Sequence, residues 1–334
     1  MRFVIFGAGA IGGVVGAKLH QSGFEVALIA RGAHYEAIRA RGLTLEQPNA
    51  AAQHLEITVA EAPDALDWGA DDVVLLATKS QDTAGALGAL RPAVPTATPV
   101  VCLQNGVENE RAALRLFPNV YGAVVMSPTA HLEPGIVHAY GTRLTGVIDV
   151  GRYPEGLDAL CEEIAQALGE SGFSSVPRSD IMRYKHAKLL SNLANAVDAM
   201  CEPGQTADEV IELAQEEGRA ALTAAGIEFV ADEVNDVVAR WKELDVQPIA
   251  GRERAGSSTR QSLARGAPAV ETDYLNGEVA LLGRLHRVAT PVNDALCELS
   301  ARHVREHRPP VSLPADEVLA LAKSGSYAGG PVRR

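Results

Sequence analysis

A glycine-rich segment between two short apolar runs constrains the fold of this chain more than any other feature. The apolar runs cover residues 2–6 and 24–29, and residues 7–12 read GAGAIG before a helix-like stretch that ends near Leu19. This order predicts a strand, a glycine turn, a helix and a second strand, which together form the βαβ unit typical of dinucleotide binding. The N-terminus of the helix would direct its free N–H groups at a pyrophosphate.

Each glycine of this pattern has a separate predicted role. Gly7 allows the tight turn, Gly9 lets the backbone approach the pyrophosphate, and Gly12 lets the helix pack closely on the strand. Arg31 follows the second strand, where a cation suits the 2′-phosphate of NADP(H) better than the 2′-hydroxyl of NAD. The alternatives are a glycine turn without a ligand and a solvated arginine at a strand end. The expected cofactor contacts in the turn are Gly7, Ala8, Gly9, Ala10, Ile11 and Gly12.

The composition disfavours several classes of protein. The chain has 334 residues, of which 47% are hydrophobic and 22% are charged, so two globular domains with substantial cores are expected. The net charge of −12 disfavours nucleic acid or an anionic membrane as the main partner. No apolar run is long enough to span a membrane, and the N-terminus does not resemble a signal peptide, which favours the cytoplasm. The cysteines form no CxxC pair and the histidines no HExxH pattern, so no metal site is expected.

Alternation of apolar runs with helix-like segments predicts an α/β fold for the first half of the chain. Residues 71–77 and 100–103 are nearly continuous apolar runs, as in strands buried on both faces of a parallel sheet. We expect a doubly wound, Rossmann-type parallel sheet, extended by antiparallel strands between residues 129 and 151. Further helices are expected at residues 34–41, 83–90, 108–116 and 156–168. An extended segment is expected at residues 43–59 and another strand at residues 120–125.

Helical periodicity dominates beyond residue 180 and predicts an all-α helical domain. The expected organisation is an NADP-binding Rossmann domain at residues 1–176 and a helical substrate and catalytic domain at residues 177–308. Residues 309–334 are rich in proline and glycine and are expected to form a loosely ordered tail. The expected helices of the second domain lie at residues 181–200, 207–225, 231–244, 258–265, 271–286 and 291–306.

Several polar stretches stand at characteristic distances from the glycine turn. They are Thr78-Lys79, Leu103-Gln104-Asn105-Gly106, the stretch from Lys188 to Asn195, Ser257-Ser258, and Glu271-Thr272-Asp273-Tyr274-Leu275-Asn276-Gly277. Together with the glycine turn they resemble the ketopantoate reductase (2-dehydropantoate 2-reductase) family, over nearly the whole chain to His307. The resemblance implies NADPH-dependent reduction of a 2-oxo acid, as in pantothenate biosynthesis, in a cleft between a Rossmann domain and a helical domain.

Lys188 is the candidate general acid. Lys188, Asn192 and Asn195 are spaced i, i+4 and i+7, so on one helix all three would project from the same face. A ketone that accepts a hydride becomes an alkoxide, and an ammonium group within reach can donate the proton and stabilise the charge. The two asparagines would bind the substrate or orient Lys188. The alternatives are a surface lysine with exposed asparagines, and Lys185, one turn earlier, as the acid.

The resemblance implies that Glu271 faces Lys188 and accepts a hydrogen bond from the substrate hydroxyl, and that Ser258 binds the substrate carboxylate. A structural role is the alternative for each. Glu271 lies near the expected start of a helix, where an acid complements the dipole, and Ser258 with Gln261 fits a capping box. The two interpretations of Ser258 are compatible, because a capped helix N-terminus also suits a carboxylate.

Two further candidates lie beyond the carboxyl ends of predicted strands, where ligands bind in doubly wound sheets. Asn105 would contact the nicotinamide or the substrate, and Lys79 would contact the cofactor phosphates or ribose. Their shared alternative is ordinary turn chemistry, because Asn-Gly and Lys-Ser-Gln-Asp are common turn sequences.

The chain departs from the family pattern on the substrate side. Ala196 stands where the second asparagine of the helix is usual, and Ala255 stands where an asparagine usually precedes the carboxylate-binding serine. Hydride chemistry is therefore better supported than ketopantoate itself as the substrate. A non-catalytic NADP-sensing binding protein and a related β-hydroxyacid dehydrogenase are alternative functions. Helical domains of this kind often expose an apolar face, which is compatible with a homodimer.

Overall fold

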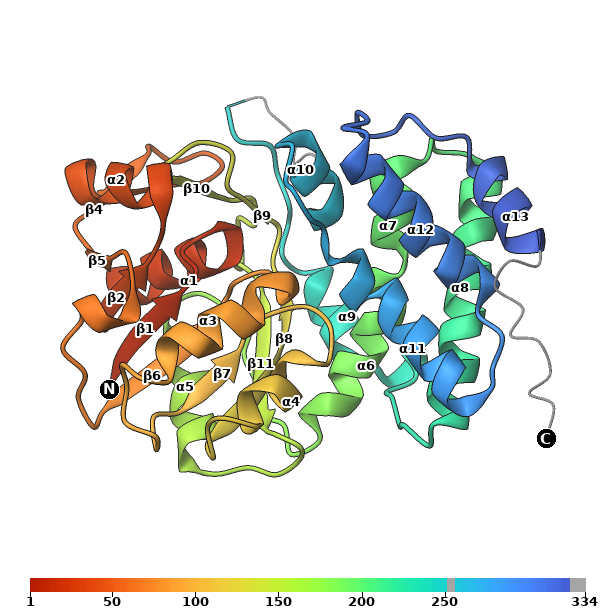
Figure 1. Ribbon diagram of the computed structural model, residues 1–334. Helices are drawn as coiled ribbons and strands as arrows, with labels where there is room; N and C mark the ends of the chain where they lie inside the picture. The colour runs from red at the N-terminus through yellow and green to blue at the C-terminus, as the bar shows by residue number, and fades with distance from the viewer. Residues whose placement is uncertain (251–255, 325–334) are drawn as a thin grey trace. The chain divides into compact units, whose positions relative to one another are not determined.

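The computed structural model of the protein describes residues 1–250 and 256–324, which divide into two compact units (Figure 1). The first unit comprises Met1–Lys185 and the described part of Ala231–Arg254. The second comprises His186–Val230 and the described part of Ala255–Arg334. Among the helices of the described residues, none combines the length and the apolar character that a membrane crossing needs.

A seven-stranded sheet forms the centre of the first unit, with the strand order β11-β8-β7-β6-β1-β2-β5. The strands are β1 (Arg2–Phe6), β2 (Glu25–Ile29), β5 (Thr58–Ala60), β6 (Asp72–Leu76), β7 (Val100–Cys102), β8 (Val120–Met126) and β11 (Val147–Arg152). All neighbouring pairs are parallel except β8 with β11, which is antiparallel. This order, which reverses direction beside β1, confirms the doubly wound Rossmann-type sheet.

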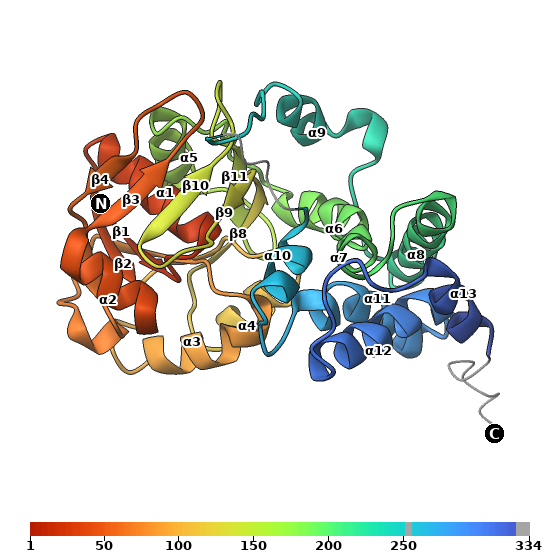
Figure 2. The same ribbon diagram turned by 90° about the horizontal axis from the view of Figure 1, so that it is seen from above.

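Helices cover both faces of this sheet, which explains why its strands are almost continuously apolar. Phe3 and Ile5 belong to the core that includes α1 (Ala10–Gln21) and α5 (Ala159–Glu170). Val74 and Leu76, on the opposite face, belong to the core under α3 (Thr83–Leu90) and α4 (Asn109–Leu114). Figure 2 shows α1 and α5 on one side of the sheet and α3 and α4 on the other.

A smaller, four-stranded sheet packs on α1 from the side away from the first sheet. Its strands, in the order β4-β3-β10-β9, are β4 (Gln53–Leu55), β3 (Leu43–Glu46), β10 (Ile136–Ala139) and β9 (Thr129–Ala130). The approach to α1 is close, since a Cβ at Gly13 would lie 2.7 Å from Val137 Cγ1. The predicted antiparallel extension is confirmed for β11, whereas β10 pairs parallel with β3 and antiparallel with β9.

The segment expected to contain the domain boundary at residues 176 and 177 belongs to the first unit. Ile148 N–H donates to the Ser174 carbonyl, and Arg178 N–H donates to the Val150 carbonyl, so this segment pairs along β11. The unit ends instead at Lys185, within helix α6 (Ile181–Asn192). Sequence composition could not show this, because the pairing depends on contacts with residues 27 positions earlier in the chain.

The structure also corrects the helix expected at residues 231–244. Only a 3₁₀ turn, η3 (Asp232–Val234), and the short helix α9 (Asp236–Trp241) form there, and both belong to the first unit. The cause is a buried carboxylate, Asp149, which ion-pairs with Arg240 and, at 3.0 Å, with Arg178. Val237 and Leu244 are also buried, in an apolar cluster with residues of the first unit, and this burial further stabilises the position of the segment.

The second unit is all-helical, as predicted. Its helices are the C-terminal part of α6, α7 (Ala194–Met200), α8 (Gln205–Ala224), α10 (Ser258–Ala264), α11 (Asn276–His286), α12 (Pro291–Arg305) and α13 (Ala315–Lys323), with a 3₁₀ turn, η4 (Glu271–Tyr274). A single apolar core joins these helices, and α8 contacts α7, α11, α12 and α13 (Figure 2). Glu217 of α8 accepts the N–H groups of Val292 and Asn293 and so caps α12.

Three expected elements differ from the structure. The helix expected at residues 181–200 is interrupted at Leu193, and the helix expected at residues 271–286 is interrupted at Leu275. The tail expected from residue 309 is not loose over its first part, because Leu313 and Val318 are fully buried in the helical core. Their burial holds α13 in place, whereas residues 325–334 lie outside the described residues.

Candidate active site

The glycine turn after β1 has the geometry that its predicted roles require. Gly7 has φ +105°, a conformation that glycine adopts readily, and a Cβ there would lie 2.9 Å from the Ala77 carbonyl carbon. A Cβ at Gly12 would lie 2.9 Å from both Ile5 and Ala77, so helix α1 could not pack as closely with a larger residue. At Gly9 the space that a Cβ would occupy is open. Backbone at Gly9 is therefore accessible to a ligand.

The N-terminus of α1 offers backbone donors at the same place. Gly9 is the N-cap residue and provides no side chain, so the first N–H groups of the helix have no side-chain acceptor. The buried Ala8 and the half-buried Ala10 and Ile11 complete the turn. The turn can therefore bind a phosphate through backbone N–H groups and the helix dipole.

Arg31 lies where the second strand ends, at the N-cap position of helix α2 (Gly32–Arg41), without a side-chain capping bond. Its side chain is 82% exposed and pairs with Asp82 at 3.2 Å. An exposed pair of this kind is weak, so the guanidinium remains able to bind an anion. Lys79 is half-buried at the N-terminus of the 3₁₀ turn η2 (Ser80–Asp82), after β6. Both cations therefore belong to the carboxyl edge of the sheet.

Asn105 follows β7 at the same edge of the sheet. Its backbone carbonyl accepts hydrogen bonds from Ser80 Oγ at 3.2 Å and from Asn109 Nδ2 at 2.9 Å. Its side-chain amide is half-buried and makes no hydrogen bond with any residue that the structure describes. The amide is thus oriented by a fixed backbone and is available to a ligand.

Lys185, the alternative candidate for the acid, is buried and bound by neighbouring groups inside the first unit. Its ammonium pairs with Glu110 at 2.8 Å and donates to the carbonyls of Gln104 at 2.9 Å and Ala123 at 3.1 Å. One ion pair and two hydrogen bonds thus hold the ammonium in this position. Both side chains are almost completely buried, and burial raises the pKa of Glu110 although Lys185 opposes that shift. The pair is a structural anchor, which makes Lys185 unsuitable as a proton donor to substrate.

The helical unit contains the remaining predicted residues. Lys188 is half-buried and Asn192 is 9% exposed, and both lie in the last two turns of α6. Asn192 Nδ2 is buried and has no hydrogen-bond partner among the described residues. Asn195 does not continue this helix as expected, because the interruption at Leu193 places it in the first turn of α7. Leu193 itself keeps a right-handed helical conformation, so a shared face for the three residues stays a prediction.

Helix α10 brings Ser258 to the start of α7. Ser257 N–H donates to Asp198 at 2.8 Å, and Ser257 Oγ donates to the carbonyl of Asn195 at 3.2 Å. Ser257 is also the residue that caps α10, since its Oγ accepts from Arg260 N–H, so the capping role predicted for Ser258 is wrong. Ser258 Oγ is buried instead without a hydrogen-bond partner in the described chain.

Asn276 is the first residue of α11 and brings the start of that helix to the junction of α6 and α7. Its side chain is completely buried and donates to the Leu193 carbonyl at 3.3 Å and to Asn293 at 3.0 Å. Glu271 begins this 3₁₀ turn and is 4% exposed, so it lies deeper than an acid that only complements a helix dipole. The ends of α6, α7 and α10 thus meet the start of α11 within the helical unit, and η4 directly precedes α11.

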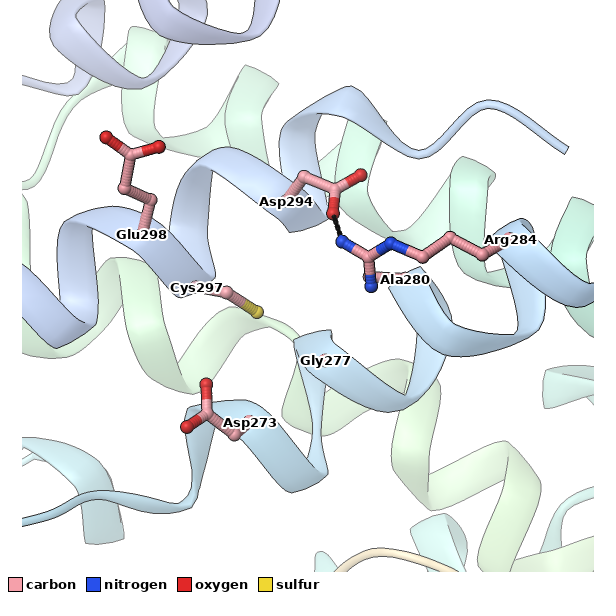
Figure 3. A pocket seen from close by; sticks show the side chains of 7 residues that line it. All are labelled: Asp273, Gly277, Ala280, Arg284, Asp294, Cys297 and Glu298. Atoms are coloured by element: carbon pink, nitrogen blue, oxygen red, sulfur yellow. Dashed lines mark hydrogen bonds and ion pairs between the residues drawn. The ribbon is translucent and has the colours of Figure 1, made fainter. Parts of the chain in front are cut away.

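A separate cavity is lined by residues of η4, α11 and α12 and does not include the predicted site residues. Figure 3 shows its lining: Asp273, Gly277, Ala280, Arg284, Asp294, Cys297 and Glu298. Arg284 pairs with Asp294, and burial together with the acids Asp273 and Asp294 raises the pKa of Cys297 to about 12. A thiol with this pKa stays protonated and is a poor nucleophile and a poor metal ligand.

The sheet order, the glycine turn and the helical second unit define a Rossmann-type dinucleotide-binding protein with an all-α unit. Comparison with protein families makes the assignment specific. Residues 3–155 match the family described as ketopantoate reductase PanE/ApbA, and residues 180–303 match its C-terminal family. The chain therefore belongs to the ketopantoate reductase family, a family of oxidoreductases, which confirms the resemblance seen in the sequence.

Individual relatives cover almost the whole chain. The 2-dehydropantoate 2-reductase of Pyrococcus horikoshii is 31% identical over 307 residues, which cover 90% of this chain and 96% of that protein. The enzyme of the same name from Mesorhizobium japonicum is 32% identical over 331 residues, covering 90% of this chain and 97% of its own.

Solved structures show the same fold. A ketopantoate reductase of this family from Ralstonia eutropha is 30% identical with a TM-score of 0.77, covering 92% of this chain and 100% of that one. D-mandelate dehydrogenase in a ternary structure with NADH and anilino(oxo)acetate is 25% identical with a TM-score of 0.77, covering 92% and 99%.

Sequence reasoning missed the residues that support the candidate site. Asn109, Thr83 and Glu110 hold the Asn105 turn, and Asn276 holds the start of α11 against Leu193, yet none was assigned a role. Asn276 stood within the stretch that suggested the family, so a buried amide could have been suspected there. Ala255, one of the departures from the family pattern, lies outside the described residues.

Proposed function

We propose that this protein reduces a small 2-oxo acid to the corresponding 2-hydroxy acid with NADPH, and that ketopantoate or a related acid is the substrate. The observation that carries the proposal is the pair of buried polar atoms without partners, Asn192 Nδ2 and Ser258 Oγ, in a helical unit of this family. A buried donor without an acceptor costs about 1–3 kcal/mol, so a bound polar ligand is its natural complement. The 2-dehydropantoate 2-reductases among the relatives act on such an acid.

The residues of the first unit fit a bound nicotinamide dinucleotide. Open space at Gly9 and the uncapped N-terminus of α1 suit the pyrophosphate, and Arg31 suits the 2′-phosphate. NADPH, when bound, would supply the hydride. Lys79 and Asn105 would contact it from the next two loops along the edge of the sheet.

Lys188 would donate a proton to the substrate oxygen as it becomes an alkoxide. The burial of Lys185, its ion pair with Glu110 and its two hydrogen bonds support Lys188 as the acid, because they hold the competing lysine of the same helix away from a substrate. Glu271 would orient the ammonium of Lys188 and accept a hydrogen bond from the substrate hydroxyl. Ser258 Oγ would donate to the carboxylate, and the amides of Asn192 and Asn195 would bind the remaining polar groups of the substrate.

A second candidate is a reductase of bulkier 2-oxo acids that uses NADH. The ternary structure of D-mandelate dehydrogenase, with NADH and anilino(oxo)acetate, favours it. The departure at Ala196 also favours it, since this residue is 1% exposed within the helical core and offers no amide to a small acid. Arg31 weighs toward NADPH.

A substrate panel tests these functions directly. The protein is mixed with NADPH or NADH and with ketopantoate, pyruvate or benzoylformate, and loss of the reduced-nicotinamide absorbance is followed. Reduction of ketopantoate with NADPH supports the first candidate, and faster reduction of benzoylformate with NADH supports the second. Tight NADPH binding without turnover of any acid would instead indicate a non-catalytic cofactor-sensing protein.

Lys188→Ala tests the proposed acid. We expect kcat to fall by about 10²–10⁴-fold, the usual contribution of general acid catalysis, while the Kd for NADPH stays unchanged. Lys323→Ala, which removes an exposed lysine from α13, is the matched control and should retain the parent rate. A Lys188→Ala variant with the parent rate would show that the acid is another group.

A further inference from the structure

The turn that carries Asn105 is held by side chains that no role in the reaction has yet explained. Its next residue, Gly106, has φ +78°, a conformation that glycine adopts readily. The Asn105 carbonyl accepts two side-chain hydrogen bonds, from Asn109 Nδ2 at 2.9 Å and from Ser80 Oγ at 3.2 Å. The preceding carbonyl, of Gln104, accepts from Lys185 at 2.9 Å.

Asn109 is the centre of this arrangement. The residue is 2% exposed, and its Nδ2 also contacts Ser80 Oγ at 3.3 Å while its Oδ1 accepts from Thr83 Oγ1 at 2.7 Å. Thr83 in turn accepts from Gln104 Nε2 at 2.7 Å. The amide of Asn109 and the hydroxyl of Thr83 are thus both used as donors and acceptors, which fixes their orientation.

The network connects two loops of the sheet edge. Ser80 and Thr83 belong to the segment after β6, which also carries Lys79, and Gln104, Asn105 and Asn109 belong to the segment after β7. Ordinary turn chemistry does not require side-chain bonds between two such loops. A buried neutral network of this kind adds little net stability compared with apolar packing, but it selects one geometry.

We infer that Asn109 is a positioning residue for the reductase reaction, acting through Asn105. The inference rests on the proposed function. By holding the Asn105 carbonyl, Asn109 fixes the direction in which the Asn105 amide leaves the backbone, and that amide has no partner within the described protein. A displacement of about 1 Å in such a group costs about 10²-fold in rate.

A double-mutant cycle between Asn105 and Asn109 tests this inference. We expect Asn105→Ala and Asn109→Ala each to lower kcat/KM for the 2-oxo acid by about 10²-fold. If Asn109 acts through Asn105, the double variant should be no more than about threefold worse than Asn105→Ala alone, because interacting residues are not additive. A purely structural role predicts two independent losses that multiply.

Thr83→Val keeps the inference testable if Asn109→Ala folds poorly. Valine has a similar shape and removes the donor to Asn109, so kcat/KM should fall, and Thr83→Ser, which keeps the hydroxyl, should restore it. Asn119→Ala, which removes one exposed amide bond to the Ala97 carbonyl in the same unit, is the control and should match the parent.

Each outcome decides one question. Independent losses in the double variant, or a parent rate for either single variant, overturn the positioning role while the proposed function stands. A parent protein that binds NADPH but reduces no 2-oxo acid overturns the proposed function and, with it, this inference. A non-additive cycle with rescue by Thr83→Ser supports the positioning role.

Discussion

Two polar clusters in this protein differ in how completely their hydrogen bonds are formed. In the first unit, the amide of Asn109 and the hydroxyl of Thr83 are bonded as donors and acceptors, and only Gln104 Oε1 of their network is buried without a partner in the described chain. In the helical unit, Asn192 Nδ2, Ser258 Oγ and Thr259 Oγ1 are buried without partners among the described residues. Both clusters are built from short neutral side chains, so residue type alone does not explain the difference.

We interpret the contrast as a difference in role: the bonded groups maintain the local structure, and the unbonded groups are candidates for binding a ligand. Bonded polar groups hold a turn in one conformation, whereas each unbonded buried group costs about 1–3 kcal/mol. A protein retains such a cost where function requires it. We therefore expect substitutions in the first cluster to affect stability or geometry, and substitutions in the second to affect substrate binding.

Lys185→Met should give the largest effect on stability. The change leaves Glu110 as a buried charge without its partner, which costs about 3–5 kcal/mol in the free energy of unfolding. Denaturant unfolding of the variant measures the loss. Lys188→Met, one turn later on the same helix and half-buried, is the comparison and should lose turnover but little stability. Equal stability losses in the two variants would contradict the assignment of Lys185 as the anchor.

Ser258→Ala should affect substrate binding and Ser257→Ala should affect stability, although the two residues are adjacent. Removal of the unbonded Ser258 hydroxyl should raise the KM for the 2-oxo acid about 10-fold or more, as for a lost bond to a charged group, with no loss of stability. Removal of the Ser257 cap should lower the free energy of unfolding by about 1 kcal/mol. Steady-state kinetics and denaturant unfolding of both variants decide the matter, and a destabilised Ser258→Ala would show that its hydroxyl is structural.

Arg31→Ala should have a moderate and selective effect. Loss of the exposed guanidinium should raise the KM for NADPH by about 10-fold and leave the KM for NADH unchanged, because only NADPH carries the 2′-phosphate. Arg39→Ala removes another exposed arginine of the same helix, paired with Glu36, and is the control. Equal changes for the two cofactors would exclude Arg31 as the phosphate contact.

The smallest expected effect is a pH dependence from His34. This imidazole bonds the Ala8 carbonyl at 2.8 Å through Nε2 and accepts the Gly135 N–H at 2.9 Å through Nδ1, so it is neutral, and His131 packs against it with ring centroids 4.1 Å apart. Burial lowers the pKa of His34, although its bond to Ala8 opposes the shift. Its contribution to stability is therefore complete above about pH 6.5, the unfolded pKa, and is lost as pH falls toward the lower folded value.

Thermal unfolding across this pH range measures the effect, and His34→Gln should reduce its slope. The Kd for NADPH should rise as the pH falls through the same range, because His34 holds the glycine turn at Ala8. A slope that is identical in the parent and the variant would show that other groups are responsible.

Local sequence pattern was sufficient for most of the first unit. The glycine turn, the buried strands such as β6 and β7, and helix α3 are specified by neighbours in sequence, since strands buried on both faces must be continuously apolar. The helical character of the second unit followed from periodicity in the same way.

Long-range contacts decided what local pattern could not. The segment containing α9 belongs to the first unit because Arg240 meets Asp149, 91 residues away, and the tail is ordered because Leu313 and Val318 enter the helical core. The interruption at Leu193 accompanies the hydrogen bond from Asn276, 83 residues away, to its carbonyl.

The sequence by itself determined the fold class, the dinucleotide-binding turn and the family, because these depend on glycine spacing, apolar periodicity and short polar motifs. Only the tertiary structure decided which of two lysines is an anchor, which of two adjacent serines caps a helix, and which amides are bonded. Those properties depend on burial and on the partners that distant segments bring within hydrogen-bond distance, and neither is encoded in the spacing of residues along the chain.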